Sequence, residues 1–208
     1  PAASFRAARI MNMTTATAAR LKHLSAEQVG FYRENGYLRI PNVYSASELE
    51  GMERDFMNLI ATWSDTSMGW TGPWRRVYMD EETEKASKLT AMHDLQFYSQ
   101  HWAKAVANPG LCDALEDLLG PNVELHHTTM HVKPPSTGHP FPMHQDWAFY
   151  KHNDGRYVDA IVHLDDTNDE NGCLRFLAGS HKQGALDHVT LTAEGGCTPH
   201  LPTDPWRL

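Results

Sequence analysis

The pentapeptide MHQDW, from Met143 to Trp147, lies at the centre of an aromatic run that contains prolines, and it predicts how the chain is organised. In a strand, alternate side chains point to the same face, so His144 and Asp146 can direct an imidazole nitrogen and a carboxylate oxygen toward one point. With a further histidine from elsewhere, these donors form the two-histidine, one-carboxylate face that holds non-haem Fe(II). The pattern indicates a metal site at His144 and Asp146.

The sequence around this pentapeptide has the composition of short β-strands. Four runs rich in β-branched and aromatic residues are separated by turn sequences of Pro, Asn, Asp and Gly. The runs are Val123 to Lys133, Phe141 to Tyr150, Tyr157 to Leu164 and Cys173 to Ala178. Strands at this spacing predict a jelly-roll or cupin-type barrel.

The part of the chain before residue 120 is predicted to be mostly helical. Capping-box patterns at Ser25 and Ser45 begin a helix over 26–35 and a second helix with an apolar stripe, which we expect to be buried. The stripe consists of Leu49, Met52, Phe56, Leu59, Ile60 and Trp63. Further helices are predicted over 93–107 and from Pro109 to near Gly120, and Tyr37 to Ile40 predicts a strand.

Residues 64–92 contain glycines, a proline and a charged run, so they predict an irregular segment. Trp70 and Trp74 in this segment either pack the loop or line a substrate opening. The predicted fold class is α+β: a double-stranded β-helix, or jelly roll, in 121–208, buttressed by N-terminal helices in 25–120.

Length and composition limit the possible functions. A chain of 208 residues suits one domain, and the net charge of -8 argues against a nucleic-acid partner. The three cysteines, Cys112, Cys173 and Cys197, lack CxxC spacing and suit a reducing compartment. No apolar run is long enough for a membrane helix. We expect a cytoplasmic protein that acts on a small molecule, without a nucleic-acid or membrane partner.

The first 24 residues are predicted to be a disordered arm or upstream read-through, and residues 25–208 the domain itself. Residues 1–26 contain Arg6, Arg9, Arg20 and Lys22 but no acid, so a mitochondrial transit peptide is the alternative.

Three motifs occur in a fixed order along the second half of the chain. They are HTTMHVKPP from His127 to Pro135, HQD from His144 to Asp146, and NGCL from Asn171, which runs on to GSHK at Gly179 to Lys182. In this order the chain resembles the phytanoyl-CoA dioxygenase family of Fe(II)- and 2-oxoglutarate-dependent oxygenases, over about residues 25–190. Ala178 departs from the family pattern, which commonly has proline there.

The resemblance implies that His144 and Asp146 bind iron and that 2-oxoglutarate and molecular oxygen are the co-substrates. By family position, Thr129 and His131 contact 2-oxoglutarate; Lys133, on the same strand face, adds positive charge, and Phe141 and Tyr150 flank the metal pair. The implied reaction is hydroxylation of an unactivated carbon in a small organic or acyl substrate. Asp146 favours hydroxylation, because related halogenating enzymes have a small residue at this position.

The resemblance also implies a distal histidine and an arginine that pairs with 2-oxoglutarate. Neither is recognisable, since His200 lies between prolines in a predicted loop. We therefore expect the late strands and both residues to lie beyond Leu208, and this polypeptide to be inactive alone.

Other interpretations remain open. His144 and Asp146 can be surface residues on a turn, and the polar residues from Thr129 to Lys133 can be ordinary strand residues. A cupin-like metal isomerase or hydrolase needs the same two ligands without 2-oxoglutarate, and a non-catalytic jelly-roll fragment needs neither. The sequence predicts no particular substrate and no oligomeric state.

Overall fold

The structure is a computed structural model that describes residues 21–152, 154–193 and 195–202. The helices are α1 (Ala26–Asn35), α2 (Ala46–Thr62), α3 (Arg75–Tyr78), α4 (Glu81–Ala86), α5 (Gln100–Val106) and α6 (Pro109–Leu119), and the 3-10 turns are η1 (Leu95–Phe97), η2 (Asp146–Ala148) and η3 (Ser180–Gln183). The strands are β1 (Asp65–Ser67), β2 (Leu89–His93), β3 (Thr129–Val132), β4 (Val189–Thr192) and β5 (Gly195–His200).

Local signals place the long helices where the sequence predicts them. Ser25 and Ser45 both form complete capping boxes, with Gln28 and Glu48 as the reciprocal partners. Helix α1 ends at Gly36, whose φ of 83° is readily adopted only by glycine. The predicted helix over 26–35 is confirmed.

The main core lies between α2 and an antiparallel sheet of order β1-β2-β3. Buried Leu59 packs with Met92 of β2 and Met130 of β3, and partly buried Phe56 and Ile60 of α2 complete the cluster. The apolar stripe of α2 is therefore confirmed as core except at its end, where Trp63 is 62% exposed.

A second cluster joins α1 to α6 through buried Leu24, Val29 and Ala114. The carboxylate of Asp117 accepts hydrogen bonds from the backbone N–H groups of Lys22, His23 and Leu24. These contacts correct the predicted arm over 1–24, since residues 21–24 are anchored to α6; residues 1–20 lie outside the described part.

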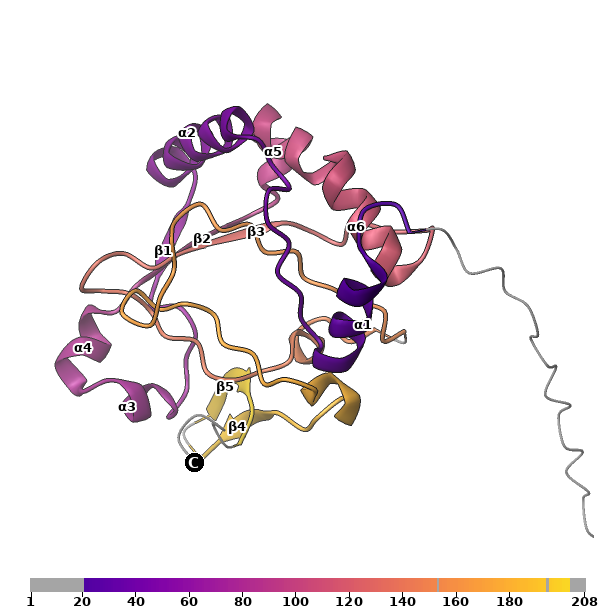
Figure 1. The fold of residues 1–208 in the computed structure, drawn as a ribbon. Coiled ribbons are helices and arrows are strands. Elements are labelled where there is room, and N and C mark those ends of the chain that lie inside the picture. The colour runs from indigo at the N-terminus through magenta and orange to yellow at the C-terminus, as the bar shows by residue number, and fades with distance from the viewer. Residues whose placement is uncertain (1–20, 153, 194, 203–208) are drawn as a thin grey trace, which may run out of the picture.

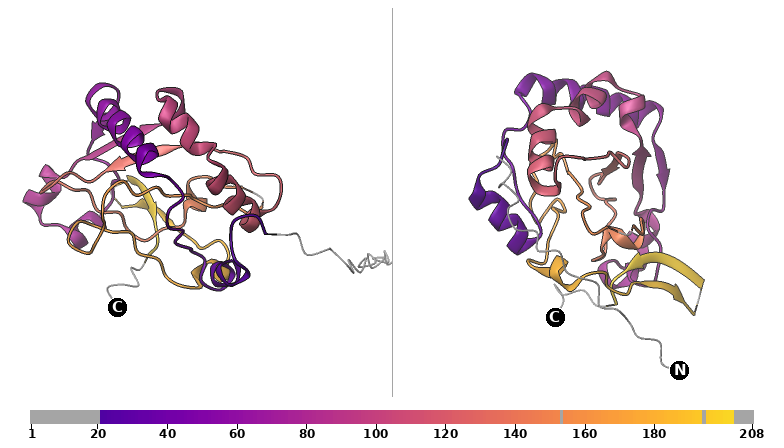
Figure 2. Two further views of the ribbon diagram at one scale, coloured as in Figure 1. Left: turned by 45° about the horizontal axis from the view of Figure 1, so that its top comes forward. Right: turned by 90° about the vertical axis from the view of Figure 1, so that its right-hand side faces the viewer.

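Figure 1 shows α2, α5 and α6 along one side of the molecule and the β4–β5 hairpin at the opposite end. The chain between β3 and β4 runs through the middle, between these two parts, mostly without regular structure (Figure 2). This central passage carries the HQD motif.

Most of the predicted late strands are wrong. Among the described residues, the run from Val123 to Lys133 forms only β3, Phe141 to Tyr150 contains the turn η2, and 157–164 and 173–178 form no strand. High β-propensity forms a strand only where a neighbouring segment pairs with it, and these runs have no such ladder within the described chain. The observed architecture is α+β, with helices and two small antiparallel sheets; the residues that the structure describes form no jelly roll.

Three predictions in the first half are also wrong. Residues 64–92, predicted to be irregular, contain β1, α3, α4 and most of β2. The segment from Tyr37 to Ile40 pairs with no strand in the described part of the chain, and the helix predicted over 93–107 is replaced by the end of β2, η1 and the shorter α5. The break occurs because Asp94 adopts a φ of 58°, and Ser99 then caps α5. No helix among the described residues is both long and apolar enough to cross a membrane.

Candidate metal centre

The side chains of His144 and Asp146 converge. Nε2 of His144 lies 3.1 Å from Oδ1 of Asp146, and both side chains are partly exposed. Nδ1 of His144 donates to the carbonyl of Pro142 at 2.7 Å, so the lone pair of Nε2 is left for the metal side. Two donors at right angles, each about 2.1 Å from an ion, are about 3.0 Å apart. The pair therefore fits adjacent ligand positions of one metal ion.

The backbone conformation that brings these two side chains together is not the strand that the sequence predicts. Gln145 is extended, with φ -110° and ψ 134°, whereas Asp146 already begins the 3-10 turn η2. Gln145 is held from the 184–188 segment: its side chain donates to the carbonyl of Gly184 and accepts from the N–H of Leu186. Gln145 is therefore held by the 184–188 segment, whereas His144 is held by the carbonyl of Pro142.

Asp159 is a carboxylate of this site that the sequence does not single out. Desolvation of its carboxyl group, a hydrogen bond with Asp146 and the charge of Asp146 raise the pKa of Asp159 to about 8. Burial alone would raise the pKa of Asp146 too, but the neighbouring His144 and a hydrogen bond from Asp159 hold that pKa well below its usual range. Asp146 is thus the ionised member of the pair at neutral pH and Asp159 the largely protonated one.

Three of the five predicted cofactor residues, His131, Phe141 and Tyr150, interact with the metal pair or with residues that pack against it. His131 interacts electrostatically with both His144 and Asp146, and its ring lies 5.3 Å from that of Phe141. The charge of Asp146 acts on Tyr150. The hydroxyl of Thr129 donates to the carbonyl of Met92 at 3.2 Å, on the same face of β3 as His131.

Lys133 is engaged elsewhere. Its ammonium group donates to the carbonyl of Gly172 at 2.8 Å and lies 5.4 Å from the centre of the Phe141 ring. It therefore joins β3 to the NGCL motif instead of pointing free into the site.

Trp70 forms an aromatic wall of the metal pair. Its indole lies 4.7 Å from the ring of His144, 4.7 Å from Phe141 and 5.0 Å from Phe149. Of the two roles that the sequence leaves open for Trp70, packing is the one observed, and the packing partner is a candidate ligand.

A cavity of about 530 Å³ opens beside the metal pair. Phe149, Tyr150 and Tyr157 form its aromatic walls, and Glu124 and Lys151 bring opposite charges to it. Phe149 also packs 5.8 Å from His144, so the cavity and the metal pair share one wall.

His200 does not lie in the loop that the sequence predicts. It ends strand β5 instead of lying in a loop, it is buried, and its Nδ1 donates to the carbonyl of Thr198 at 2.9 Å. Its ring packs against Trp74. Within the described ranges, no cluster of three or more His, Cys, Asp or Glu side chains has the geometry of a metal site.

Residues 32–203 match the sequence profile of the family described as phytanoyl-CoA dioxygenase (PhyH). The chain belongs to the phytanoyl-CoA dioxygenase family.

Several curated proteins are similar to this family member. A probable alpha-ketoglutarate-dependent hypophosphite dioxygenase of Stutzerimonas stutzeri is 32% identical over 78% of this chain and 56% of its own length. Dioxygenase lolE1 of Epichloe uncinata is 30% identical over 86% of this chain and 67% of its own. The peroxisomal phytanoyl-CoA dioxygenase of Rattus norvegicus is 28% identical over 83% and 52%. The chain thus spans between about half and two thirds of these relatives.

The phytanoyl-CoA dioxygenase motifs identify the residues that converge in space, but not their supports. His144 and Asp146 stand in one motif, whereas Trp70, Asp159 and His188 approach that motif from distant segments. The local sequence offers few signals for these supporting residues: Asp159 stands two residues after Tyr157, and Trp70 lies between Gly69 and Gly72.

Proposed function

We propose that this chain provides the metal-binding part of an Fe(II)- and 2-oxoglutarate-dependent dioxygenase. The observation that carries the proposal is the convergence of His144 Nε2 and Asp146 Oδ1 at 3.1 Å, within a chain of this family. The relative from Stutzerimonas stutzeri, named as alpha-ketoglutarate-dependent, supports the same co-substrate. The double-stranded β-helix is proposed as the fold of the whole domain, and family membership supports it.

His144 and Asp146 would hold the iron through one imidazole nitrogen and one carboxylate oxygen. When bound, Fe(II) supplies the redox centre at which dioxygen, 2-oxoglutarate and a C–H bond give succinate, carbon dioxide and an alcohol. Asp146, ionised at neutral pH, supplies negative charge to the cation, and the contact with Pro142 fixes the His144 tautomer.

The chain's other residues would orient the two organic molecules. Thr129, His131 and Lys133 are proposed to face 2-oxoglutarate, with Lys133 exchanging the Gly172 carbonyl for a carboxylate. The substrate is proposed to enter the 530 Å³ cavity, since Phe149 belongs to both the cavity wall and the surroundings of His144. Aromatic walls with opposite charges at Glu124 and Lys151 suit a small organic molecule with polar ends.

Anaerobic titration of the chain with Fe(II) and 2-oxoglutarate tests the proposal. We expect metal binding in the wild type, its loss in His144→Ala and Asp146→Ala, and its retention in His163→Ala, which changes an exposed histidine outside the candidate ligand pair. Equal binding by all four proteins would refute the proposed site. Metal binding without any 2-oxoglutarate binding would instead favour a cupin-like isomerase or hydrolase.

A further inference from the structure

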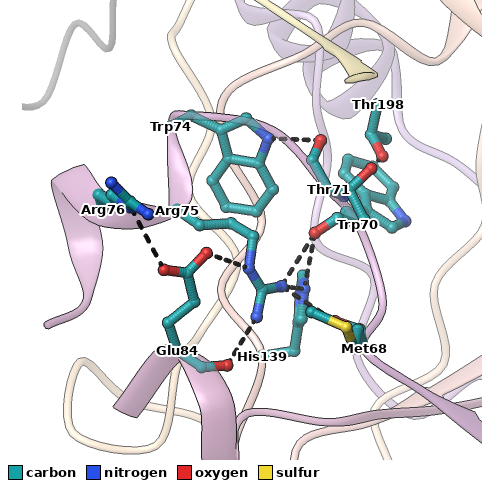
Figure 3. Close-up of polar contacts among 9 residues, drawn as sticks. All are labelled: Met68, Trp70, Thr71, Trp74, Arg75, Arg76, Glu84, His139 and Thr198. Atoms are coloured by element: carbon teal, nitrogen blue, oxygen red, sulfur yellow. Dashed lines mark hydrogen bonds and ion pairs between the residues drawn. The ribbon is translucent and has the colours of Figure 1, made fainter. Parts of the chain in front are cut away.

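A fully enclosed arginine lies next to the Trp70 wall. The Arg75 side chain is only 2% exposed, although its guanidinium group always carries a charge. Nη1 of Arg75 donates to the carbonyls of Met68 and Trp70, both at 2.9 Å, and lies 2.6 Å from Nε2 of His139. Its other nitrogens contact Glu84, through the carbonyl at 3.1 Å and the carboxylate at 3.3 Å (Figure 3).

The two ends of this guanidinium group have different partners. The Nε and Nη2 end contacts Glu84 of α4, and this charge pairing offsets the cost of burying the cation. The Nη1 end contacts the backbone of the loop that carries Trp70 and the ring of His139. Only the Nη1 end faces the candidate metal centre.

His139 lies at the Nη1 end. Its side chain is fully buried, and its Nε2 lies 2.6 Å from Nη1 of Arg75 and 3.2 Å from the carbonyl of Trp70, so the ring packs against both groups. Burial lowers the pKa of His139, a hydrogen bond to the Trp70 carbonyl opposes this shift, and the neighbouring Arg75 cation lowers the pKa further. Its ring also packs 5.4 Å from Phe141, which in turn contacts Trp70.

Trp70 connects the Arg75 contacts to the metal pair. Its carbonyl is bound by Arg75, while its indole contacts the His144 ring at a steep angle of 70°. The next residue, Thr71, is fixed from the other side, since it exchanges hydrogen bonds of 2.8 and 2.9 Å with Thr198 of β5. The Trp70 backbone is therefore held on both sides, and its indole has little freedom to leave His144.

We propose that Arg75 is a positioning residue that fixes the Trp70 indole against His144 and thereby sets the orientation of the imidazole toward Asp146. Arg75 touches neither the metal pair nor the cavity; it acts through Trp70. The significance for iron binding rests on the proposed function, whereas the orientation of His144 is a property of the metal-free chain.

The test compares variants that disturb one end of the guanidinium group at a time. Arg75→Lys removes the fork that reaches Trp70 and Glu84 together, because an ammonium group cannot span both. Glu84→Gln weakens only the far end. Arg76→Lys is the matched control, since Arg76 is the exposed neighbour that pairs with the same Glu84 at 3.7 Å. Trp70→Leu removes the indole without unpairing the buried cation.

Two measurements are made on each variant: the NMR signals of the His144 ring in the metal-free chain, assigned with His144→Gln, and Co(II) binding followed by its visible absorption. We expect Arg75→Lys and Trp70→Leu to shift the His144 signals and to weaken Co(II) binding about tenfold, as for other residues that orient metal ligands. Glu84→Gln and Arg76→Lys should leave the His144 signals in place, even where unfolding shows lower stability.

Unchanged His144 signals in both Arg75→Lys and Trp70→Leu would overturn the positioning role. So would an equal shift in Glu84→Gln at equal loss of stability, because this would indicate general loosening. If wild-type Co(II) binding is the same as in His144→Gln, the proposed function fails, and the NMR signals alone then decide the role of Arg75.

Discussion

The backbone N–H of Gln145 donates a hydrogen bond to Nε2 of His188 across 2.8 Å. Nδ1 of His188 donates to the carbonyl of Leu186 at 2.9 Å, which leaves Nε2 as the acceptor that this contact requires. The residue between the two candidate ligands is therefore fixed by a segment far along the chain. The geometry of the metal pair therefore depends on the segment that contains His188 and leads into β4.

His188→Ala should weaken metal binding and lower stability. The substitution leaves the N–H of Gln145 without its acceptor, a loss of about 1–3 kcal/mol when the group is shielded from water. Urea unfolding and Co(II) titration measure the two effects. His163→Ala, an exposed histidine, is the control and should change neither. A His188→Ala chain with wild-type Co(II) binding would show that this anchor is unnecessary.

Asp159→Asn should change how stability depends on pH. An aspartate with a pKa of about 8 in the folded state, against about 4 when unfolded, makes the folded chain bind more protons between these values. The free energy of unfolding of the wild type should therefore fall, relative to Asp159→Asn, as pH rises from about 4 to about 8.

Unfolding of the metal-free proteins at a series of pH values tests this dependence. Asp154→Asn is the control, because pairing with Arg156 lowers the pKa of Asp154 to about 2 and its contribution changes only in acid, below pH about 4. A constant difference between wild type and Asp159→Asn from pH 5 to 8 would contradict the raised pKa.

Gly69→Ala should destabilise the loop that carries Trp70. Gly69 has a φ of +75°, and an added Cβ would lie 2.6 Å from Cδ2 of buried His139. Backbone strain and overpacking together should cost at least about 2 kcal/mol. Gly30→Ala, in the middle of α1 with no atom near the new Cβ, should instead stabilise by about 0.5–1 kcal/mol. Thermal unfolding compares the two, and equal effects would contradict the loop geometry.

Leu59→Ala should remove the contact between α2 and the sheet. Leu59 is 4% exposed and packs on Met92 and Met130, so the cavity should cost about 2–5 kcal/mol. Met57→Ala, on the exposed face of the same helix at 60% exposure, should change stability by less than about 0.5 kcal/mol. Denaturant unfolding measures the change in stability of both variants. A small effect of Leu59→Ala would contradict a main core between α2 and the sheet.

Features that depend on neighbouring residues could be predicted from the sequence. Ser25 and Ser45 cap their helices as predicted, and α6 begins at Pro109 as predicted, because a helix start depends on only a few neighbouring residues. The pairing of His144 with Asp146 was also predicted, although the backbone that achieves it is a turn entry and not a strand. The predicted roles of Thr129, His131, Lys133, Phe141 and Tyr150 remain predictions.

The strands could not be predicted to the same degree, because a strand exists only where a second segment supplies its hydrogen bonds. The run from Tyr157 to Leu164 has strand-like composition but forms no ladder with any described segment, whereas the Gly- and Pro-containing β5 pairs with β4.

The sequence by itself determined the capped helices α1, α2 and α6 and the two donor side chains, since each depends on contacts within a few residues. Only the tertiary structure decided what holds those donors in place: Trp70 with Arg75 and His139, Asp159, and His188. These contacts join residues many positions apart, and their chemistry becomes meaningful only when folding removes water from between them.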